Sequence, residues 1–257
     1  ISLSVHLLSV LFRINILFYR IELKKIVSVI TIENMTQTNT KLVESSFYIT
    51  YVFLMTTATI TFIEAIRTQD AKIRNILNLE TCISVVAAFF YGKFVSLFEK
   101  KTDAVSYKTI NDMRYLDWSI TTPIMLLVLV LALLYNVKGG SLQFKSFLTI
   151  LILNYGMLGS GYLGEISFMD KTVANAMGFL FFIGLFYYIY ANYVAKRPNF
   201  DNRMLYMAFL GLWTIYGVAY FYDEVTKNVV YNVLDLFSKC FVGIFFWAYY
   251  TKVFRLD

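Results

Sequence analysis

Seven apolar stretches, each long enough to cross a lipid bilayer as a helix, constrain the fold of this chain more than any other feature. A spanning helix needs about 20 predominantly apolar residues. The stretches are residues 44–66, 75–97, 111–135, 144–163, 172–194, 203–222 and 228–252. Charged residues make up 16% of the chain, whereas a soluble domain carries about 25%. We therefore predict an all-α membrane protein, a bundle of seven transmembrane helices with short connections.

Residues 1–34 differ from the rest of the chain. They begin with Ile rather than Met. Four basic residues interrupt their apolar sequence: Arg13, Arg20, Lys24 and Lys25. This N-terminal extension is typical of upstream translation, a presequence or a basic interfacial helix, and these alternatives stay open. Because Met35 directly precedes the first apolar stretch, we expect residues 35–257 to form the complete seven-helix domain.

Basic residues in the connections predict the orientation of the chain, because cytoplasmic loops carry an excess of Lys and Arg. With the N-terminus outside, the inside connections and the tail would hold Arg67, Lys72, Arg74, Lys138, Lys145, Lys196, Arg197, Arg203, Lys252 and Arg255. The outside connections would hold Lys100, Lys101, Lys108, Lys171 and Lys227, partly offset by acidic residues. We therefore expect the N-terminus outside and the C-terminus inside, in a plasma or internal membrane of the host cell.

Composition argues against several classes of function. The net charge is +6, but the basic residues form no stripe suited to a nucleic acid. The single histidine, His6, and the two cysteines, Cys82 and Cys240, give neither a metal-binding spacing nor a disulfide framework. The sequence contains no hydrolase or nucleotide-binding motif, so we expect no enzyme. The expected partners are the lipid bilayer and transported cations or protons, without a nucleic acid and with a homo-oligomer left open.

Charged side chains within the apolar stretches are the first candidates for function, because a charge at the centre of a bilayer is costly. Asp235 and Lys239 lie four residues apart and therefore share one helix face. Arg114 and Asp117 lie about one turn apart, and Thr121 follows one turn later. The pattern fits an ion-pair network that only ties helices together. It also fits a lysine that condenses with an aldehyde, an established use of a buried lysine.

Two segments carry a resemblance to a known family. Residues 114–123, Arg-Tyr-Leu-Asp-Trp-Ser-Ile-Thr-Thr-Pro, resemble the third-helix signature of the microbial rhodopsins. Residues 235–239, Asp-Leu-Phe-Ser-Lys, resemble their seventh-helix signature. The resemblance covers residues 44 to about 254, and it implies a seven-helix protein with all-trans retinal bound as a Schiff base on Lys239.

The resemblance also implies roles for the other charged residues. Asp117 is implied to be the primary counterion and proton acceptor, and Asp235 the second counterion. Arg114 is implied to be their partner, and Thr121 to hydrogen-bond Asp117. These roles are carried over by position from the family, and the spacing alone does not assign them.

An aromatic pocket for the retinal is a further implication of the resemblance. The matching positions are Tyr115, Trp118, Thr122, Met125, Met157, Gly161, Phe182, Trp213 and Tyr216. The sequence departs from the family at two points. Gly217 stands where the family usually has proline, and Tyr220 stands where a second tryptophan is common. The apolar residue at Met125 implies absorption of green light.

Outward proton pumps of this family use carboxylates that this chain lacks at the usual positions. Such pumps place one on the third helix, eleven residues after the counterion, and here that position is Val128. They often carry a glutamate in the outer part of the seventh helix, at the position of Lys227. Both ends of the usual proton relay are therefore missing, while the acceptor Asp117 is retained.

Polar residues elsewhere in the apolar stretches favour a channel. Polar groups that face a bundle interior can line a wet path, although they also serve as interhelical hydrogen bonds. The candidates for an ion pathway are Ser45, Ser46, Glu80, Asn228 and Asn232. This combination resembles the group 1 rhodopsins of large algal viruses, which implies a light-gated cation channel. A light-driven outward proton pump and a sensory photoreceptor are the alternatives.

Overall fold

The computed structural model describes residues 40–99, 106–137, 140–196 and 198–251. The chain divides into two compact units, Ile1–Val43 and Glu44–Asp257. The predicted extension, residues 1–34, lies outside the described residues, so its assignment stays a prediction. The following description concerns the second unit.

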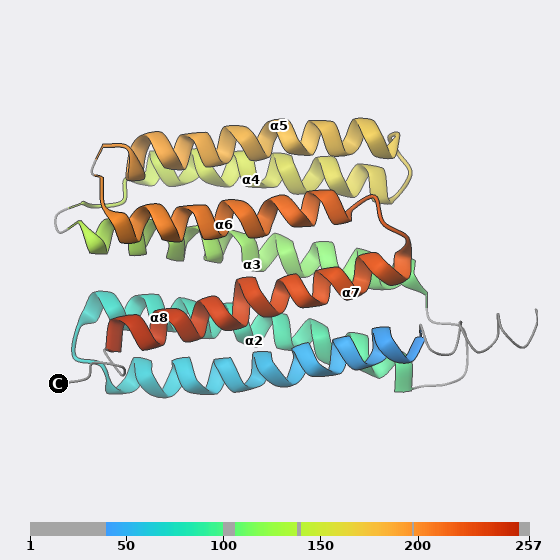
Figure 1. The fold of residues 1–257 in the computed structure, drawn as a ribbon, viewed down its shortest axis with the longest axis horizontal. Coiled ribbons are helices and arrows are strands. Elements are labelled where there is room, and N and C mark those ends of the chain that lie inside the picture. Colours follow the sequence, from blue (N-terminus) through green and yellow to red (C-terminus); the bar gives the residue numbers. More distant parts are fainter. Residues whose placement is uncertain (1–39, 100–105, 138–139, 197, 252–257) are drawn as a thin grey trace, which may run out of the picture. The chain divides into compact units, whose positions relative to one another are not determined.

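Seven helical runs make up the described part of this unit (Figure 1). The first is the helix Thr40–Arg67. The others are α2 (Ala71–Glu99), α3 (Tyr107–Asn136), α4 (Phe144–Glu165), α5 (Lys171–Ile189) continued by η1 (Tyr190–Val194), α6 (Phe200–Ala219), and α7 (Glu224–Asp235) continued by η2 (Leu236–Phe241) and α8 (Val242–Thr251). Six of the runs are long and apolar enough to cross a membrane, and α6 completes the bundle. The predicted boundaries agree to within about four residues, and the seven-helix architecture is confirmed.

Polar side chains start several of these helices. An N-cap side chain accepts a hydrogen bond from the free N–H groups of the first turn, which stabilises the helix by about 1 kcal/mol. Five helices, α2, α3, α5, α6 and α7, begin in this way, with the caps Asp70, Ser106, Asp170, Asn199 and Asp223. The cap Asp223 accepts from the hydroxyl of Thr226 and from the N–H groups of Thr226 and Val225, and these bonds hold the pKa of its carboxyl below the usual value. These caps fix where the short connections end.

Pro123 lies inside α3 without ending it. Proline has no N–H, so the carbonyl of Ser119, one turn earlier, loses its helical partner. The hydroxyl of Tyr155 in α4 donates to that carbonyl at 3.0 Å. The side chain of a neighbouring helix therefore replaces the missing bond and ties α3 to α4.

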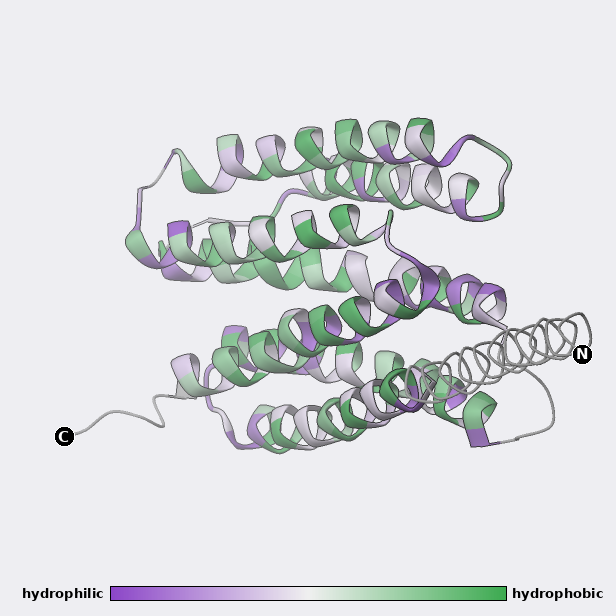
Figure 2. Ribbon diagram, turned by 45° about the vertical axis from the view of Figure 1, so that its right-hand side comes forward, coloured by the Kyte–Doolittle hydropathy of each residue, from purple (hydrophilic) through white to green (hydrophobic). Residues whose placement is uncertain are grey.

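The faces of the helices that point away from the bundle are apolar. Figure 2 shows hydrophobic residues along the middle of the helices and hydrophilic ones gathered near several helix ends. Large apolar side chains such as Phe89, Leu180 and Tyr187 are exposed on the surface of the bundle. Buried positions include charged and amide side chains. This distribution suits a protein whose surroundings are lipid, because lipid is as apolar as the exposed side chains.

The two ends of the bundle differ in what lies between the helices. We call them the Lys227 end, where α3 and α7 begin and α4 ends, and the Asp70 end, where α2 begins. The main apolar core fills the half towards the Asp70 end, with Leu126, Leu129 and Phe186 fully or almost fully buried. In the other half, polar side chains occupy the interior.

Candidate site around Lys239

Lys239 lies in the centre of the bundle between two carboxylates. Its Nζ donates to Asp117 Oδ2 at 2.7 Å and lies 3.3 Å from Asp235 Oδ2. The three side chains are at most 1% exposed. Asp117 comes from α3, whereas Asp235 and Lys239 come from the last helical run, so the predicted charges meet across two helices.

Arg114 supplies the second buried cation. Its Nη2 donates to Asn232 Oδ1 at 2.8 Å and to Asn228 Oδ1 at 3.1 Å, and Nη1 lies 3.6 Å from Asp235 Oδ2. The guanidinium also lies over aromatic rings at 5.3 to 5.8 Å, namely those of Phe47, Tyr91, Phe94 and Tyr231. Such contacts stabilise a desolvated cation. Two cations and two carboxylates therefore balance in charge around Lys239.

Hydroxyl groups surround Asp235 but not Asp117. Tyr216 donates to Asp235 Oδ1 at 2.5 Å, and Tyr91 donates to Oδ2 at 2.8 Å. Within the described residues Asp117 Oδ1 has no hydrogen-bond partner. Thr121 reaches Asp117 differently from the prediction, because its Oγ1 donates to the main-chain carbonyl at 2.9 Å rather than to the carboxylate. A threonine inside a helix readily satisfies its hydroxyl on the preceding turn.

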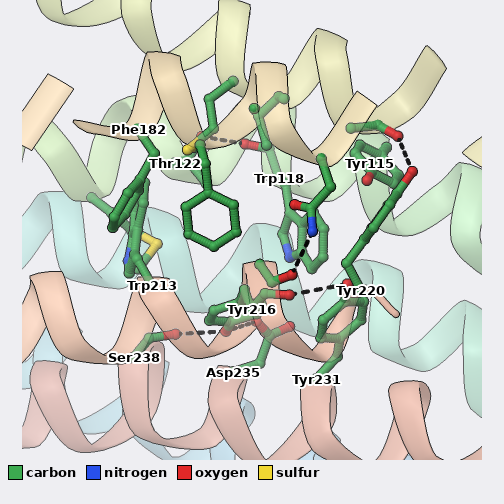
Figure 3. Close-up of a pocket in the computed structure, with 18 of the residues that line it drawn as sticks. Tyr115, Trp118, Thr122, Phe182, Trp213, Tyr216, Tyr220, Tyr231, Asp235 and Ser238 are labelled. Atoms are coloured by element: carbon green, nitrogen blue, oxygen red, sulfur yellow. Dashed lines mark hydrogen bonds between the residues drawn. The ribbon is translucent and has the colours of Figure 1, made fainter. Parts of the chain in front are cut away.

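A cavity of about 770 Å³ extends from Lys239 between α3, α4, α5, α6 and the last helical run. All nine residues predicted for the pocket lie on its wall: Tyr115, Trp118, Thr122, Met125, Met157, Gly161, Phe182, Trp213 and Tyr216. Figure 3 labels six of them, among them Trp118, Phe182 and Trp213. Trp118 and Tyr216 pack edge to face with ring centroids 5.5 Å apart. Aromatic rings therefore form a large part of the wall, and the charged groups of Asp235 and Lys239 lie at one place along it.

The two departures in α6 have a structural reason. A Cβ on Gly217 would lie 2.6 Å from Phe179 Cζ, so this position must stay small for the ring to keep its place on the cavity wall. The carbonyl of Gly217 accepts from Asn175 Nδ2 at 3.1 Å. Tyr220 also lines the cavity, and its hydroxyl donates to the carbonyl of Gly161 at 2.9 Å.

Sequence reasoning missed two tyrosines that complete the site. Tyr91 bridges Arg114 and Asp235, and Tyr231 lies on the cavity wall. Tyr231 is four residues before Asp235, so helix periodicity could have found it. Tyr91 is eleven residues after Glu80, which puts both on one face of α2.

A comparison with known proteins decides the family. The family model described as bacteriorhodopsin-like protein matches residues 42–253. The chain belongs to the bacteriorhodopsin-like family. The crystal structure of the viral rhodopsin OLPVRII is similar, with a TM-score of 0.77 and 56% identity over 83% of this chain and 100% of that one. The predicted membership in the microbial rhodopsins, and the resemblance to viral ones, are confirmed.

Two curated rhodopsins are more distant relatives. The green-light absorbing proteorhodopsin of Gamma-proteobacterium EBAC31A08 is 26% identical over 225 residues, which are 80% of this chain and 86% of the relative. The blue-light absorbing proteorhodopsin of Gamma-proteobacterium Hot 75m4 is 24% identical over 218 residues, 77% and 82% of the two chains. The chain is therefore an integral, multi-pass membrane protein with the retinal chromophore of its family.

The cavity of this rhodopsin fits such a chromophore. Among the described residues on its wall the one amine is Lys239 Nζ, aromatic rings form a large part of that wall, and Asp117 Oδ1 is a buried acceptor without a partner in the described part of the chain. An amine that becomes linked to an aldehyde and stays protonated needs nearby negative charge. Asp117 and Asp235 provide that charge, so the donor set agrees with the group that the family carries.

The predicted pathway residues of this rhodopsin fall into different environments. Asn232 donates from Nδ2 to Ser46 Oγ at 2.8 Å, while Asn228 and Asn232 both accept from Arg114. Ser45 is exposed on the first helix, so Ser46 is the serine that faces the interior and Ser45 does not join the network. Helix rotation explains this, because adjacent residues point about 100° apart.

Glu80 lies apart from the other predicted pathway residues. It is 2% exposed, and its Oε2 has no hydrogen-bond partner in the described residues. A Cβ on Gly243 would lie 3.1 Å from this oxygen and 3.0 Å from Thr57 Cγ2. Gly243 is one turn beyond Lys239, so Glu80 reaches the last helical run on the Asp70 side of the lysine.

Lys227 is not a loop charge. It is 1% exposed and lies between Glu165 and Glu224, with Nζ 2.9 Å and 2.7 Å from their Oε1 atoms. The carboxylates that sequence reasoning found missing at this end are therefore present. They come from the end of α4 and from one turn earlier in α7.

Proposed function

We propose that this rhodopsin is a light-gated cation channel, with retinal linked to Lys239. The family moves ions in response to light, and the channel is our specific assignment within it. Retinal, when bound, supplies absorption of visible light and a change of shape at the centre of the bundle. Asp117 would hold the charge of the linked nitrogen and accept its proton, and Asp235 would be held in place by Tyr91, Tyr216 and Arg114.

The observation that carries the proposal is the presence of buried polar side chains on both sides of Lys239. Towards the Lys227 end these are Asp235, Asn232 and Asn228, which lie about one turn apart on one helix face. A cation that crosses an apolar bundle needs such groups in place of its water. With the N-terminus outside, as the loop charges predict, this side faces the exterior and Ser46 forms part of its wall.

Glu80 is the corresponding group on the Asp70 side. It brings a carboxylate between the first helix and α8, in the half that the apolar core fills. At the pump position, Val128 is fully buried and carries no proton. We therefore propose an inner constriction at Glu80, a central one at Lys239 with Asp117 and Asp235, and an outer vestibule at Asn228 and Asn232.

Photocurrent under voltage clamp tests the proposal. A channel passes current that reverses with voltage, whereas a pump passes outward current over a wide range of voltage. Glu80→Gln should change the amplitude or the reversal potential by removing a charge from the pathway, and it should leave the colour nearly unchanged because Glu80 lies off the cavity wall. Ser84→Ala, one turn away on the same face of α2, is the matched control and should leave both unchanged.

An outward proton pump is the second candidate. The 2.7 Å contact between Lys239 and Asp117 favours it, because a pump needs an acceptor beside the nitrogen. A purely outward, rectified proton current in the unmodified protein, with Glu80→Gln silent in amplitude and reversal potential, would overturn the channel and establish the pump. A sensory photoreceptor would give neither current.

A further inference from the structure

The Lys227 end of the bundle holds a cluster of polar side chains beyond the residues of the proposed pathway, and it is buried at Asn111 and Lys227 but partly exposed at Glu224. We call Asn111, Glu165, Glu224 and Lys227 the outer cluster. They come from α3, α4 and α7, which approach one another at this end (Figure 1). The ammonium of Lys227 contacts both carboxylates, and Asn111 Nδ2 donates to Glu165 Oε1 and to Glu224 Oε2. Three helices are thus joined by charge and by one amide.

The cluster has more oxygen acceptors than donors. Two carboxylates face one ammonium, so its formal charge is −1. Glu165 Oε2 and Asn111 Oδ1 are buried and have no hydrogen-bond partner among the described residues. Asn111 is 4% exposed, and the side chains of Glu165 and Glu224 are 10% and 40% exposed, so the cluster meets the surface at Glu224. Oxygen atoms of this kind, gathered from several helices, are the ligands that hard cations prefer. Lys227 Nζ occupies the position between the carboxylates that a free cation would take.

Hydrogen bonds connect this cluster to the centre of the bundle. Asn228 Nδ2 donates to the main-chain carbonyl of Glu224 at 2.9 Å, and Asn228 Oδ1 accepts from Arg114. Arg114 in turn contacts Asp235. The outer cluster is therefore linked to the proposed route by hydrogen bonds through Asn228 and Arg114.

We propose that Lys227 is a tethered cation that fills the outer cation site of the pathway, so that protons pass it and metal cations do not. This inference rests on the proposed ion pathway. A metal cation would have to displace an ammonium that two carboxylates hold on short contacts. A proton needs no such space, because carboxyl and amide groups can accept and donate it in place. Lys227 would then make the transported cation a proton.

Replacement of Lys227 tests this assignment. Lys227→Met removes the ammonium and keeps an unbranched side chain, and Lys227→Gln is a second variant that keeps a polar end. Lys171→Met is the matched control, because it removes a lysine whose charge also acts on Glu224 but whose Nζ lies outside the cluster, 5.0 Å from the ring centre of Tyr220. The visible absorption band of each retinal-loaded variant shows that it is folded.

The first measurement is the reversal potential of the photocurrent when external sodium is replaced by a large organic cation at constant pH. The unmodified protein and Lys171→Met should show no shift. Both Lys227 variants should show a shift, with the permeability to sodium relative to protons raised about tenfold or more by the negative charge left at the mouth. Sodium-dependent reversal in the unmodified protein would overturn the proposal, and so would unchanged selectivity in both variants.

The second measurement needs no current. Without its ammonium the cluster presents two carboxyl groups and an amide oxygen to the space that Lys227 Nζ left, and it should bind calcium. Added calcium should raise the melting temperature of purified Lys227→Met and leave that of the unmodified protein and of Lys171→Met unchanged. If no variant passes a passive current, the channel fails, yet calcium binding confined to the Lys227 variants still supports the tethered cation. Absence of that binding overturns it.

Discussion

The two halves of the bundle, on either side of Lys239, hold their polar groups in opposite ways. Towards the Lys227 end, buried charges have short contacts: Arg114 with two asparagines, and Lys227 with two carboxylates. Towards the Asp70 end, the apolar core fills much of the interior, and Glu80 Oε2 has no partner in the described part of the chain.

This difference indicates which half of the bundle is the more stable against a change of conformation. A buried hydrogen bond to a charged group contributes about 1.5–3 kcal/mol, and a buried charge left alone costs more than it would in water. The Lys227 half is therefore stabilised as it stands. In the Asp70 half, binding of water, a proton or a cation at Glu80 would lower the free energy of this buried carboxylate. This half is therefore the one that a change at Lys239 can most readily alter.

The largest effect is expected from the two buried lysines, one in the centre and one in the Lys227 half. Lys239→Ala, regenerated with all-trans retinal, should be colourless because its amine is the one on the cavity wall. Lys227→Ala should keep its colour, since Lys227 Nζ is engaged with Glu165 and Glu224 away from the cavity. Absorption spectra decide this, and a visible band in Lys239→Ala would refute the assignment.

The next largest effect concerns the negative charge at the centre. Asp117→Asn should shift the absorption maximum to the red at neutral pH, because removal of a carboxylate 2.7 Å from Lys239 Nζ narrows the energy gap of a positively charged chromophore. Acidification of the unmodified protein should give the same shift as Asp117 is protonated. Asp112→Asn, elsewhere on α3, is the control and should keep its colour. An unchanged spectrum in Asp117→Asn and in acid would make another group the counterion.

A carboxylate introduced into the Asp70 half should make this half more like the Lys227 half, because it adds a buried acidic group there. In the unmodified protein, recovery of the dark spectrum after a flash should slow as pH rises, because Val128 carries no proton for the Lys239 nitrogen. Val128→Asp should make recovery roughly tenfold faster or more at alkaline pH, as expected of an internal acid, and less sensitive to pH. Val128→Asn, of similar size, should not. Recovery that is already fast and independent of pH would point to Glu80 as the donor.

The smallest effect compares single hydroxyls from the two halves. Tyr91→Phe removes a donor to Asp235 and should cost about 1.5–3 kcal/mol, a fall of several degrees in melting temperature. Ser84→Ala removes a buried hydroxyl that has no partner among the described residues, so it should be nearly neutral. Thermal unfolding of the purified pigments measures both. Equal destabilisation by the two changes would contradict the contrast between the halves.

Much of the centre could be predicted from the sequence because its residues obey helix spacing. Asp235 and Lys239 are four residues apart in one segment, and the family signature added Asp117 and the pocket residues. The cavity wall then follows from which face each helix turns inward. The same reasoning did not separate Ser45 from Ser46. Both lie near the start of the first apolar stretch, where the sequence does not show which face of the helix points inward.

The outer cluster could not be predicted in this way. Lys227 looked like a connection charge because it stands near the start of an apolar stretch beside Asp223 and Glu224. Its burial depends on Glu165, which is distant in sequence and comes from the end of α4. Tyr91 was missed for a related reason, since a tyrosine among phenylalanines carries no signal until Arg114 and Asp235 are placed beside it. Which side chains meet between two helices depends on how the helices pack, and the spacing of residues within one helix does not give this.

The wide-turn segment Leu236–Phe241 has a consequence for how a change at the chromophore spreads. In a π-helical turn each backbone hydrogen bond spans one residue more than in an α-helix, so the segment holds one extra residue. Lys239 lies inside this segment, after Asp235 and before Gly243. If this segment converts to an α-helix, the helix beyond it rotates by about 100° and shifts by about 1.5 Å along its axis relative to Asp235. Gly243 would then move away from Glu80, while Asp235 and the Lys227 half kept their positions. The part of the seventh helix beyond Lys239 can therefore rotate without a movement of the part before it.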